Sequence, residues 1–430
     1  MMSCQKDVAP TPSASITNIP TQALASITST LVTSITSTTA ISGGIISTDG
    51  GAAITARGIC WGITTSPTIT GSHSTDGNGI GTFSSNLIGL TTSTIYYARA
   101  YATNSSGTSY GNEVNFTTAV PIVFLAGRDI IGFNNGLLEE AKIWINGVPS
   151  FLTTAPNTGR AFSIFALGTD VYVAGSETIG GGINSIARIW KNGVGSTLAN
   201  GAEAYSIYVS RSDVYTCGIG SNGSTTRAIV WKNGITTFLT NGTNDAFASS
   251  VFVSGTDVYV GGYERSGTKD VAKIWKNGVA TSLSNGINDN YINSIYVFGT
   301  NVYAVGAEYN GTIYNAKVWK NGVASILPSG SYANSIYVSV DGNVYIGGGE
   351  SIPGNNDRGI LWKNNILTQN PSSYGNEVHS VFVNGTDIYL ANATYVANQG
   401  ILATLWKNST STVLPTSSPI SSDAFCVFVK

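Results

Sequence analysis

Short runs of alternating hydrophobic and polar residues fill the chain from residue 29 to its end, and clusters of Gly, Asn, Asp and Ser separate them. Alternation with a period of two places successive side chains on opposite faces of a strand, so this pattern predicts half-buried β-strands. No stretch has the helical hydrophobic period, and no apolar run reaches the roughly 18 residues of a membrane-spanning helix. The chain is therefore expected to be all-β, without a transmembrane helix.

From residue 121 onward the pattern repeats. Seven of the eight tryptophans occupy one position of a unit of 41–46 residues; they are Trp144, Trp190, Trp231, Trp275, Trp319, Trp362 and Trp406. In the clearest copy, strand A begins at Ser250, strand B follows a Gly-Thr-Asp turn, strand C contains Trp275, and an Asn-Gly turn leads to strand D. A four-stranded unit of this length is the size of a propeller blade, so residues 121–430 are predicted to form a seven-bladed β-propeller.

The two ends of this repeat region complement each other. The first copy lacks strand A, and the chain finishes with an unpaired strand A at Ala424–Val429. We expect the last strand to complete the first blade, because this closes the ring and removes both open sheet edges. Strand A starts with a small residue, whereas strand C carries Trp, so the tryptophans are predicted to fill the wider gaps between blades.

Charged residues recur in the blades. In four copies an acid at the end of strand B accompanies a base two residues before Trp, and the predicted pairs are Asp129/Lys142, Glu177/Arg188, Glu264/Lys273 and Glu308/Lys317. The third and seventh copies lack both partners, and the sixth has Glu350 with Ile360. Because the acid and the base are present together or absent together in six of the seven copies, they are predicted to form cross-strand pairs with a structural role.

Residues 29–118 show the short alternating runs of a β-sandwich. The segment GLTTSTIYYARA, residues 89–100, resembles a fibronectin type III motif, although Thr92 stands where that family usually has Pro. The resemblance implies that Tyr96 forms a tyrosine corner, a buried ring whose hydroxyl bonds to backbone. Segments 56–62 and 101–118 are similar to the version of this module in Gram-negative surface lipoproteins, where it is a spacer or adhesive unit.

The first residues, MMSCQKDVAPTP, resemble the processed start of a bacterial lipoprotein. This implies lipid attachment at Cys4 and a flexible tether, with residues 1–28 outside the folded domains. The protein is then expected on the extracellular side of the outer membrane, held there only by its lipid anchor. The alternative is a free cysteine in a disordered tail.

The composition argues against several classes of function. Only 10% of residues are charged and the net charge is −2, which argues against nucleic acid as a partner. Two histidines and four cysteines without CxxC spacing do not form a metal site, and we expect no cofactor, no catalytic residue and a monomer. His379 is expected to be a half-buried core residue, and Cys60, Cys217 and Cys426 small core residues.

The B–C loops and D–A crossings share one face of a propeller, which we call the crossing face, and there the copies differ most. Acidic and aromatic residues precede strand A, and rings that stack on sugars beside carboxylates that accept hydroxyl hydrogen bonds indicate a ligand site. The predicted binding residues are Glu203, Tyr205, Asp245, Phe247, Asp289, Tyr291, Tyr332, Tyr374 and Glu377, with Asp423 and Phe425 in the same pattern. In a competing interpretation, the aromatic residues pack between the inner strands and the acidic residues lie in solvent. In a further alternative, a ring of carboxylates binds a cation.

The function predicted from these features is non-enzymatic: a cell-surface binding or adhesion protein that presents a propeller to a glycan or to a surface protein. One alternative is a glycan hydrolase or lyase that uses carboxylates such as Glu203, Asp245 or Asp289. Another is a structural subunit of a surface complex.

Overall fold

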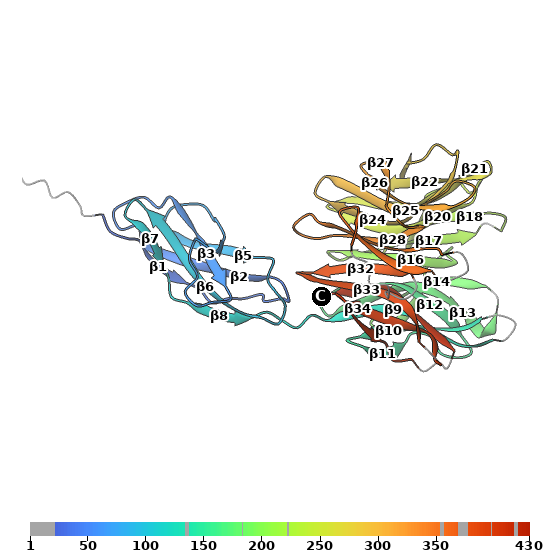
Figure 1. Cartoon of the computed structure of the whole chain (residues 1–430), viewed down its shortest axis with the longest axis horizontal. Helices are drawn as coiled ribbons and strands as arrows, with labels where there is room; N and C mark the ends of the chain where they lie inside the picture. Colours follow the sequence, from blue (N-terminus) through green and yellow to red (C-terminus); the bar gives the residue numbers. More distant parts are fainter. Residues whose placement is uncertain are drawn as a thin grey trace, which may run out of the picture. The chain divides into compact units, whose positions relative to one another are not determined.

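A computed structural model of the chain describes residues 22–133, 137–182, 184–221, 223–352, 357–368, 377–396, 398–416 and 420–430. Cys4 and Tyr374 lie outside these residues. The chain divides into two compact units, one ending at Ala119 and the other starting at Val120. Both are built from strands (Figure 1), and the short 3-10 turn η1 (Ile179–Gly181) is the helical segment within the described ranges. No described helix is long and apolar enough to cross a membrane.

The first unit is a sandwich of two sheets. One sheet has the order β1-β2-β5 and the other the order β4-β3-β6-β7, with β8 also paired to β6. Their bounds are β1 Ser26–Ser29, β2 Ala40–Thr48, β3 Ala56–Gly62, β4 Ser72–His73, β5 Gly81–Leu87, β6 Ile95–Asn104, β7 Gly107–Tyr110 and β8 Val114–Thr117. The buried faces of the two sheets enclose one apolar core that includes Ile59, Leu87 and Leu90.

Two predictions for the sandwich can be compared with the structure: the hydrogen bond of Tyr96 and the start of the domain. The hydroxyl of the buried Tyr96 accepts a hydrogen bond of 3.0 Å from the backbone N–H of Thr91, which is the contact expected of this residue. The boundary at residue 28 differs from the structure, because β1 pairs with β2 from Ser26 onward. The four residues of β1 are too few and too polar to stand out in the sequence, and it is their pairing with β2 that makes them a strand.

The second unit consists of seven four-stranded blades; five are separate sheets, whereas the last and the first blade join into one eight-stranded sheet through the parallel pairing of Ile401 with Ser421. Blades are numbered from Val120, and strands A to D of each are given in that order. Blade 1 contains β36 (Ser421–Val429), β9 (Val123–Phe133), β10 (Leu137–Ile145) and β11 (Val148–Phe151); blade 2 contains β12 (Thr158–Leu167), β13 (Asp170–Thr178), β14 (Ser185–Lys191) and β15 (Val194–Thr197); blade 3 contains β16 (Glu203–Ser210), β17 (Asp213–Ser221), β18 (Thr226–Lys232) and β19 (Ile235–Phe238); blade 4 contains β20 (Ala246–Ser254), β21 (Asp257–Ser266), β22 (Lys269–Lys276) and β23 (Val279–Ser282). Blade 5 contains β24 (Asp289–Phe298), β25 (Asn301–Tyr309), β26 (Tyr314–Lys320) and β27 (Val323–Ile326); blade 6 contains β28 (Tyr332–Val338), β29 (Val344–Glu350), β30 (Arg358–Lys363) and β31 (Ile366–Leu367); blade 7 contains β32 (Val378–Asn384), β33 (Asp387–Val396), β34 (Gly400–Lys407) and β35 (Thr410–Val413).

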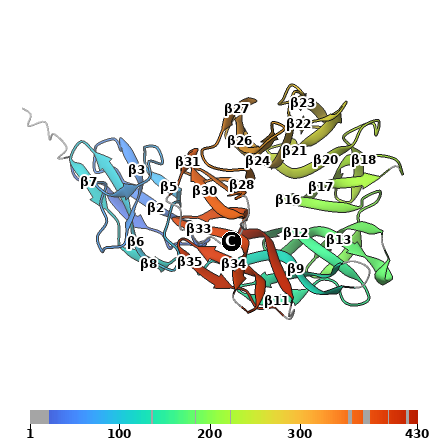
Figure 2. The ribbon, with the colours of Figure 1, turned by 45° about the vertical axis from the view of Figure 1, so that its right-hand side comes forward.

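The C-terminal strand closes the ring as predicted. β36 runs antiparallel to β9 over its whole length. Beyond the strands, the backbones of Ile122 and Lys430 exchange two hydrogen bonds of 2.9 and 3.0 Å. The last strand therefore supplies strand A of blade 1, and the blades fan about one centre (Figure 2).

A closed hoop of aromatic side chains shows that the seven strands A surround one axis. Each strand A contributes one ring, and neighbouring centroids lie 4.6–5.4 Å apart, within the contact range of aromatic pairs. The hoop consists of Phe165, Tyr208, Phe252, Tyr296, Tyr337, Phe382 and Phe428. Phe428 contacts both Phe382 and Phe165, which joins blade 7 to blade 2 through blade 1.

Hydrogen bonds also connect each blade to the next. The Oγ atom of the small residue in strand A accepts a bond of 3.1–3.4 Å from a backbone N–H in strand A of the following blade. The acceptors are Ser163, Ser206, Ser250, Ser294, Ser335 and Ser380. Cys426 holds the seventh place, where its sulfur receives the Ile164 N–H. Burial raises the pKa of the Cys426 thiol, so the sulfur stays a neutral thiol.

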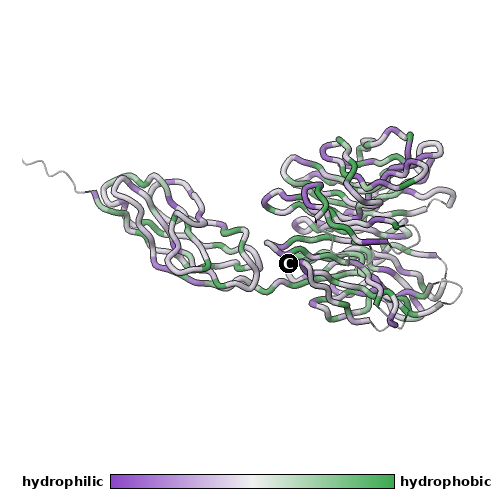
Figure 3. Tube along the Cα trace, viewed as in Figure 1, coloured by the Kyte–Doolittle hydropathy of each residue, from purple (hydrophilic) through white to green (hydrophobic). Residues whose placement is uncertain are grey.

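The tryptophans pack as predicted. All seven in the propeller are at most 5% exposed. Trp144 Nε1 donates to the carbonyl of Pro415, which lies in the neighbouring blade 7, at 2.8 Å. Hydrophobic residues occur along the strands throughout the propeller (Figure 3), and the buried ones form separate clusters between neighbouring blades instead of a single core.

All four predicted charge pairs are present. In blade 6, Glu350 instead pairs with Arg358, which lies opposite it in the β29–β30 ladder. Blade 6 therefore keeps an ion pair at the end of strand B but takes its base from Arg358 instead of from position 360.

Candidate functional site

Two positions in strand A carry most of the variation among the blades on the crossing face. The bulge position directly precedes the small residue, and in every blade the register between strands A and B shifts there. An extra residue at a bulge leaves the ladder and re-aims its side chain. The bulge residues are Phe162, Tyr205, Ser249, Asn293, Asn334, His379 and Phe425. The second position, two residues earlier, holds Arg160, Glu203, Phe247, Tyr291, Tyr332, Glu377 and Asp423.

The bulge residues divide into an aromatic and a polar side. His379, Phe425, Phe162 and Tyr205 form a chain of ring contacts with centroids 5.3–5.8 Å apart, which we call the aromatic arc. On the other side, Asn293 Nδ2 donates to the carbonyl of Ala333 at 3.1 Å. Because the scaffold is repeated but this ring of residues is not, the crossing face is chemically one-sided.

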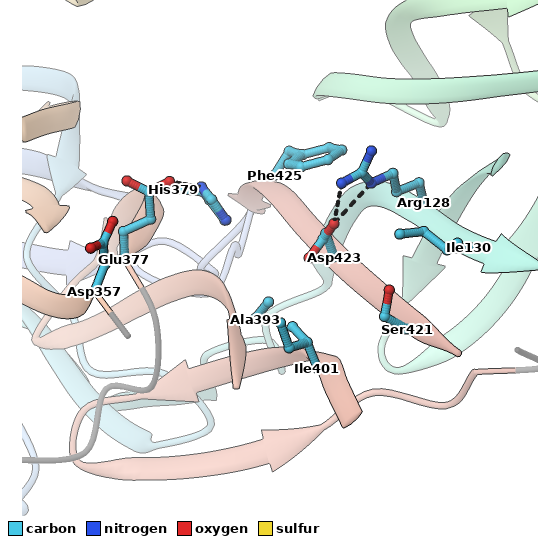
Figure 4. A pocket seen from close by; sticks show the side chains of 10 residues that line it. All are labelled: Arg128, Ile130, Asp357, Glu377, His379, Ala393, Ile401, Ser421, Asp423 and Phe425. Carbon is cyan, nitrogen blue, oxygen red and sulfur yellow. Dashed lines mark hydrogen bonds and ion pairs between the residues drawn. The ribbon is translucent and has the colours of Figure 1, made fainter. Parts of the chain in front are cut away.

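A cavity of about 510 Å³ lies beside the aromatic arc, where blades 6, 7 and 1 meet. Figure 4 shows the residues that line it, which are Arg128, Ile130, Asp357, Glu377, His379, Ala393, Ile401, Ser421, Asp423 and Phe425. The volume is typical of small-molecule sites.

One wall of this cavity is an ion-pair network. Arg128 Nε donates to Asp423 at 2.8 Å, and the same guanidinium pairs with Glu139. Arg160 pairs with Glu139 as well. Arg128 also lies 5.4 Å from the centroid of the Phe425 ring, within cation–π range. Two cations and two carboxylates thus neutralise each other and fix Phe425 in place.

The opposite wall carries Glu377, His379 and Asp357 (Figure 4). Glu377 Oε2 accepts a hydrogen bond of 3.1 Å from Asn334 Nδ2, and its Oε1 lies 3.8 Å from His379 Nδ1. Among the described residues, neither Glu377 nor Asp357 forms an ion pair with Lys or Arg. This wall can therefore accept hydrogen bonds or a positive charge.

The prediction for His379 is confirmed only in part. Its side chain is half-buried, as expected, but it lines the cavity and contacts Phe425 edge-on instead of entering the core. The cause is the bulge, because β32 shifts register between Val378 and Ser380 and leaves His379 out of the ladder. Alternation along a regular strand does not predict this orientation.

The predicted aromatic residues of blades 4 to 6 lie elsewhere on the crossing face. The Phe247 ring stacks on Tyr263 with centroids 4.8 Å apart, and Tyr291 meets Tyr263 edge-on at 5.1 Å. Tyr332 packs against Tyr314 at 4.9 Å. Burial raises the pKa of Tyr291 and of Tyr332. These rings pack mainly on one another.

The predicted acids Asp245 and Asp289 are engaged in structure. Asp245 accepts the Thr226 backbone N–H at 2.8 Å. Asp289 accepts the Asp270 N–H at 3.0 Å and Lys269 Nζ at 3.1 Å. Burial by itself would raise the pKa of Asp289, but these two bonds outweigh it and hold the pKa below its usual range. The side chain of Asp245 is 40% exposed, so the alternative in which the acids lie in solvent describes it in part, whereas Asp289, at 16%, does not fit that alternative.

Glu203 and Tyr205 lie on the other side of the aromatic arc. Glu203 lines a second cavity of about 230 Å³ together with Glu139 and Arg160. Burial, followed by the negative charge of Glu203, raises the pKa of Tyr205. Of the residues named from sequence, Glu377, Asp423 and Phe425 line the 510 Å³ cavity and Tyr205 ends the arc, whereas Arg128, Asp357 and Phe162 were missed. A comparison of the seven copies at the residue before the strand A serine would have pointed to Phe162 and His379.

The opposite face, where strands A end, is repetitive. In four blades a Lys ammonium and an Asn amide both bind the Asp that begins strand B, at 2.7–3.1 Å. These carboxylates are Asp170, Asp213, Asp257 and Asp387. A cluster copied from blade to blade is explained by the scaffold, so this face is the weaker candidate for a ligand site.

Comparison with known proteins gives distant likenesses. No protein-family model matches the chain, and no curated protein matches its sequence. Among solved structures, TolB from Acinetobacter baumannii is 10% identical with a TM-score of 0.39, over 64% of this chain and 77% of TolB. An acylaminoacyl peptidase from Pyrococcus horikoshii is 10% identical with a TM-score of 0.40, over 75% of this chain and 50% of the peptidase. The β-propeller domain of the Trilobed protease from Pyrococcus furiosus is 9% identical with a TM-score of 0.30, over 70% of this chain and 97% of that domain.

Proposed function

We propose that the protein is a non-enzymatic binding protein of the cell surface, whose propeller binds a glycan in the cavity where blades 6, 7 and 1 meet. The observation that carries this proposal is the one-sided ring of bulge residues. Seven nearly identical blades present four aromatic bulge residues in succession, and the 510 Å³ cavity opens beside two of them, His379 and Phe425.

The chemistry of the cavity suits a sugar. Sugars have an apolar face that stacks on an aromatic ring and a rim of hydroxyls that donate hydrogen bonds. Phe425, fixed by Arg128, provides the ring. Glu377 and Asp357 provide acceptors on the opposite wall. A pyranose between the two walls would satisfy both requirements.

The hydrolase alternative receives less support. A glycosidase needs one carboxyl group with a raised pKa to act as general acid. The pKa of Asp289 is lowered instead. Asp245 accepts a backbone N–H from Thr226 in strand C of blade 3. These two predicted carboxylates thus act as structural acceptors.

Surface display remains part of this proposal. Lipid attachment at Cys4 and a position outside the outer membrane are predictions from the N-terminal sequence. The sandwich, with its fibronectin type III-like motif, would be a spacer between anchor and propeller.

A glycan array probed with the full chain tests the proposal. Phe425→Ser places in blade 1 the residue that blade 4 has at the same position, Ser249, so the variant should fold. We expect Phe425→Ser to lower binding about tenfold or more, since truncating an aromatic anchor of a binding site costs about 2 kcal/mol or more.

The matched control is Phe238→Ser. It makes the same change in strand D of blade 3 and gives the residue that blade 4 has there, Ser282. Binding should be unchanged. If no glycan binds, or if both variants lose binding equally, the proposal is wrong. Release of shorter sugars from a bound glycan, detected by mass spectrometry, would instead support the hydrolase.

A further inference from the structure

We propose that the cavity selects glycans that carry a free amine, such as glucosamine oligomers, over neutral and acidic glycans. This inference rests on the proposed function and adds the charge of the ligand to it.

The charges around the cavity do not balance. Arg128 and Arg160 are matched by Glu139 and Asp423 in one network. Glu377 and Asp357 remain on the opposite wall, and His379 is the only other titratable group that faces them among the described lining residues. The segments of the propeller outside the described residues contain no Asp, Glu, Lys, Arg or His, so they do not change this tally.

The position of the excess charge matters as much as its size. The side chain of Glu377 is 34% exposed and its Oε2 is oriented by Asn334. A partly desolvated carboxylate attracts a cation more strongly than one in open solvent. A ligand ammonium on this wall would replace a counter-ion that the protein itself does not provide.

The aromatic arc favours the same kind of ligand. Cations are attracted to the faces of aromatic rings. The Arg128 guanidinium lies 5.4 Å from the centroid of the Phe425 ring, so this ring already contacts one cation, and the rings of Phe162 and His379 extend the same arc. An amino sugar on the Phe425 side could stack there and direct its ammonium to Glu377 and Asp357 across the cavity. A uronic acid would meet the same carboxylates as a like charge.

Calorimetric titration of the full chain at pH 7 tests this inference with three probes of equal length: the glucosamine trimer, its fully N-acetylated form and the galacturonate trimer. Acetylation removes the charge and keeps the sugar backbone. We expect the glucosamine trimer to bind about tenfold more tightly than the acetylated trimer, and the galacturonate trimer to bind least.

Two double variants separate local from overall charge. Glu377→Gln with Asp357→Asn should lower glucosamine binding about tenfold and lower binding of the acetylated trimer by much less, so that the preference for the amine disappears. Asp213→Asn with Asp257→Asn removes the same charge at the opposite ends of the strands and should leave all three affinities as they were.

The outcomes are distinct. If the acetylated trimer binds as tightly as the amine, selection by charge is wrong while glycan binding stands. If the Asp213/Asp257 variant loses amine binding as well, the overall charge of the protein is responsible and the site assignment fails. If neither these probes nor any arrayed glycan binds, the proposed function fails together with this inference.

Discussion

Lys142 and Asp129 form the most deeply buried ion pair of the propeller, and breaking it from one side should destabilise the fold strongly. Their side chains are 1% and 0% exposed, and the Nζ–Oδ2 distance is 2.7 Å. Lys142 Nζ also donates to the carbonyl of Pro415 in blade 7 at 3.0 Å, so the pair bridges the two blades at the closure. Lys142→Ile would leave the Asp129 carboxylate buried without its cation.

The expected magnitude follows from burial. Removing one partner of a buried pair costs about 3–5 kcal/mol, because the remaining charge has lost its solvation and its counter-ion. The Pro415 carbonyl keeps a donor in Trp144 Nε1, at 2.8 Å, so the cost comes mainly from the buried Asp129 carboxylate, which loses its cation. We therefore expect Lys142→Ile to lower the free energy of unfolding by about 3–5 kcal/mol.

Blade 3 supplies the compensating change. Its equivalent positions are Gly220 and Ile229, and Ile229 is fully buried without any ion pair. The double variant Asp129→Gly, Lys142→Ile copies this arrangement and should cost only about 1–2 kcal/mol, since no buried charge remains and a strand glycine adds about 0.5–1 kcal/mol. The cycle should thus give a coupling energy of several kcal/mol.

Guanidinium unfolding followed by tryptophan fluorescence measures these values, because seven of the eight tryptophans lie in the propeller. Lys273→Ile in blade 4 is the matched control: its pair with Glu264 has side chains 20% and 17% exposed, so water can solvate the remaining carboxylate. We expect a loss of about 1 kcal/mol there. The reasoning is refuted if Lys142→Ile costs no more than Lys273→Ile, or if the double variant costs the sum of its singles.

Two further predictions concern the links between blades and the acid stability of the opposite face. Ser250→Ala removes the acceptor for the Ile295 N–H and should lower the free energy of unfolding in denaturant by about 0.5–1.5 kcal/mol. Cys426→Ser introduces the residue of the other six blades and should leave this free energy unchanged. Equal losses in the two variants would contradict an inter-blade role for the hydroxyl. Hydrogen bonds from Lys and then Asn hold the pKa of Asp170, Asp213 and Asp257 below the usual range. Their contribution to stability is present above the unfolded pKa of about 3.9 and is lost as the pH falls through the lower folded pKa. The free energy of unfolding, measured from pH 2 to 6, should therefore be level near pH 6 and fall below about pH 4, and a curve that stays level to pH 2 would contradict this.

The propeller was predictable because its information is local and repeated. An Asn-Gly pair forms the tight turn between strands C and D in five blades: Asn277 and Gly278, for example, have φ of 50° and 83°, the two positive values of a type I′ turn. The first repeat lacks strand A and the last residues of the chain form an additional one. The sequence alone therefore predicts that the C-terminal strand closes the ring. The buried tryptophans and the charge pairs could be predicted for the same reason, since seven copies show which positions vary together.

The candidate site was predicted less well, because it depends on where strands meet. Arg128 and Asp423 are 295 positions apart and form an ion pair only because β36 pairs with β9. His379 lines the cavity only because β32 carries a bulge. Asp245 and Asp289 looked like ligand-binding acids in sequence, yet the backbone N–H groups that they accept come from other strands.

The sequence by itself determined the number of blades, the order of strands in each and the strand that closes the ring, since turn residues and alternation act within a few residues of the chain. Only the tertiary structure decided which side chains surround the cavity and which carboxylates already have partners. Those properties arise when seven bulged strands are arranged around one axis. They depend on contacts between residues that are separated in the sequence by other strands.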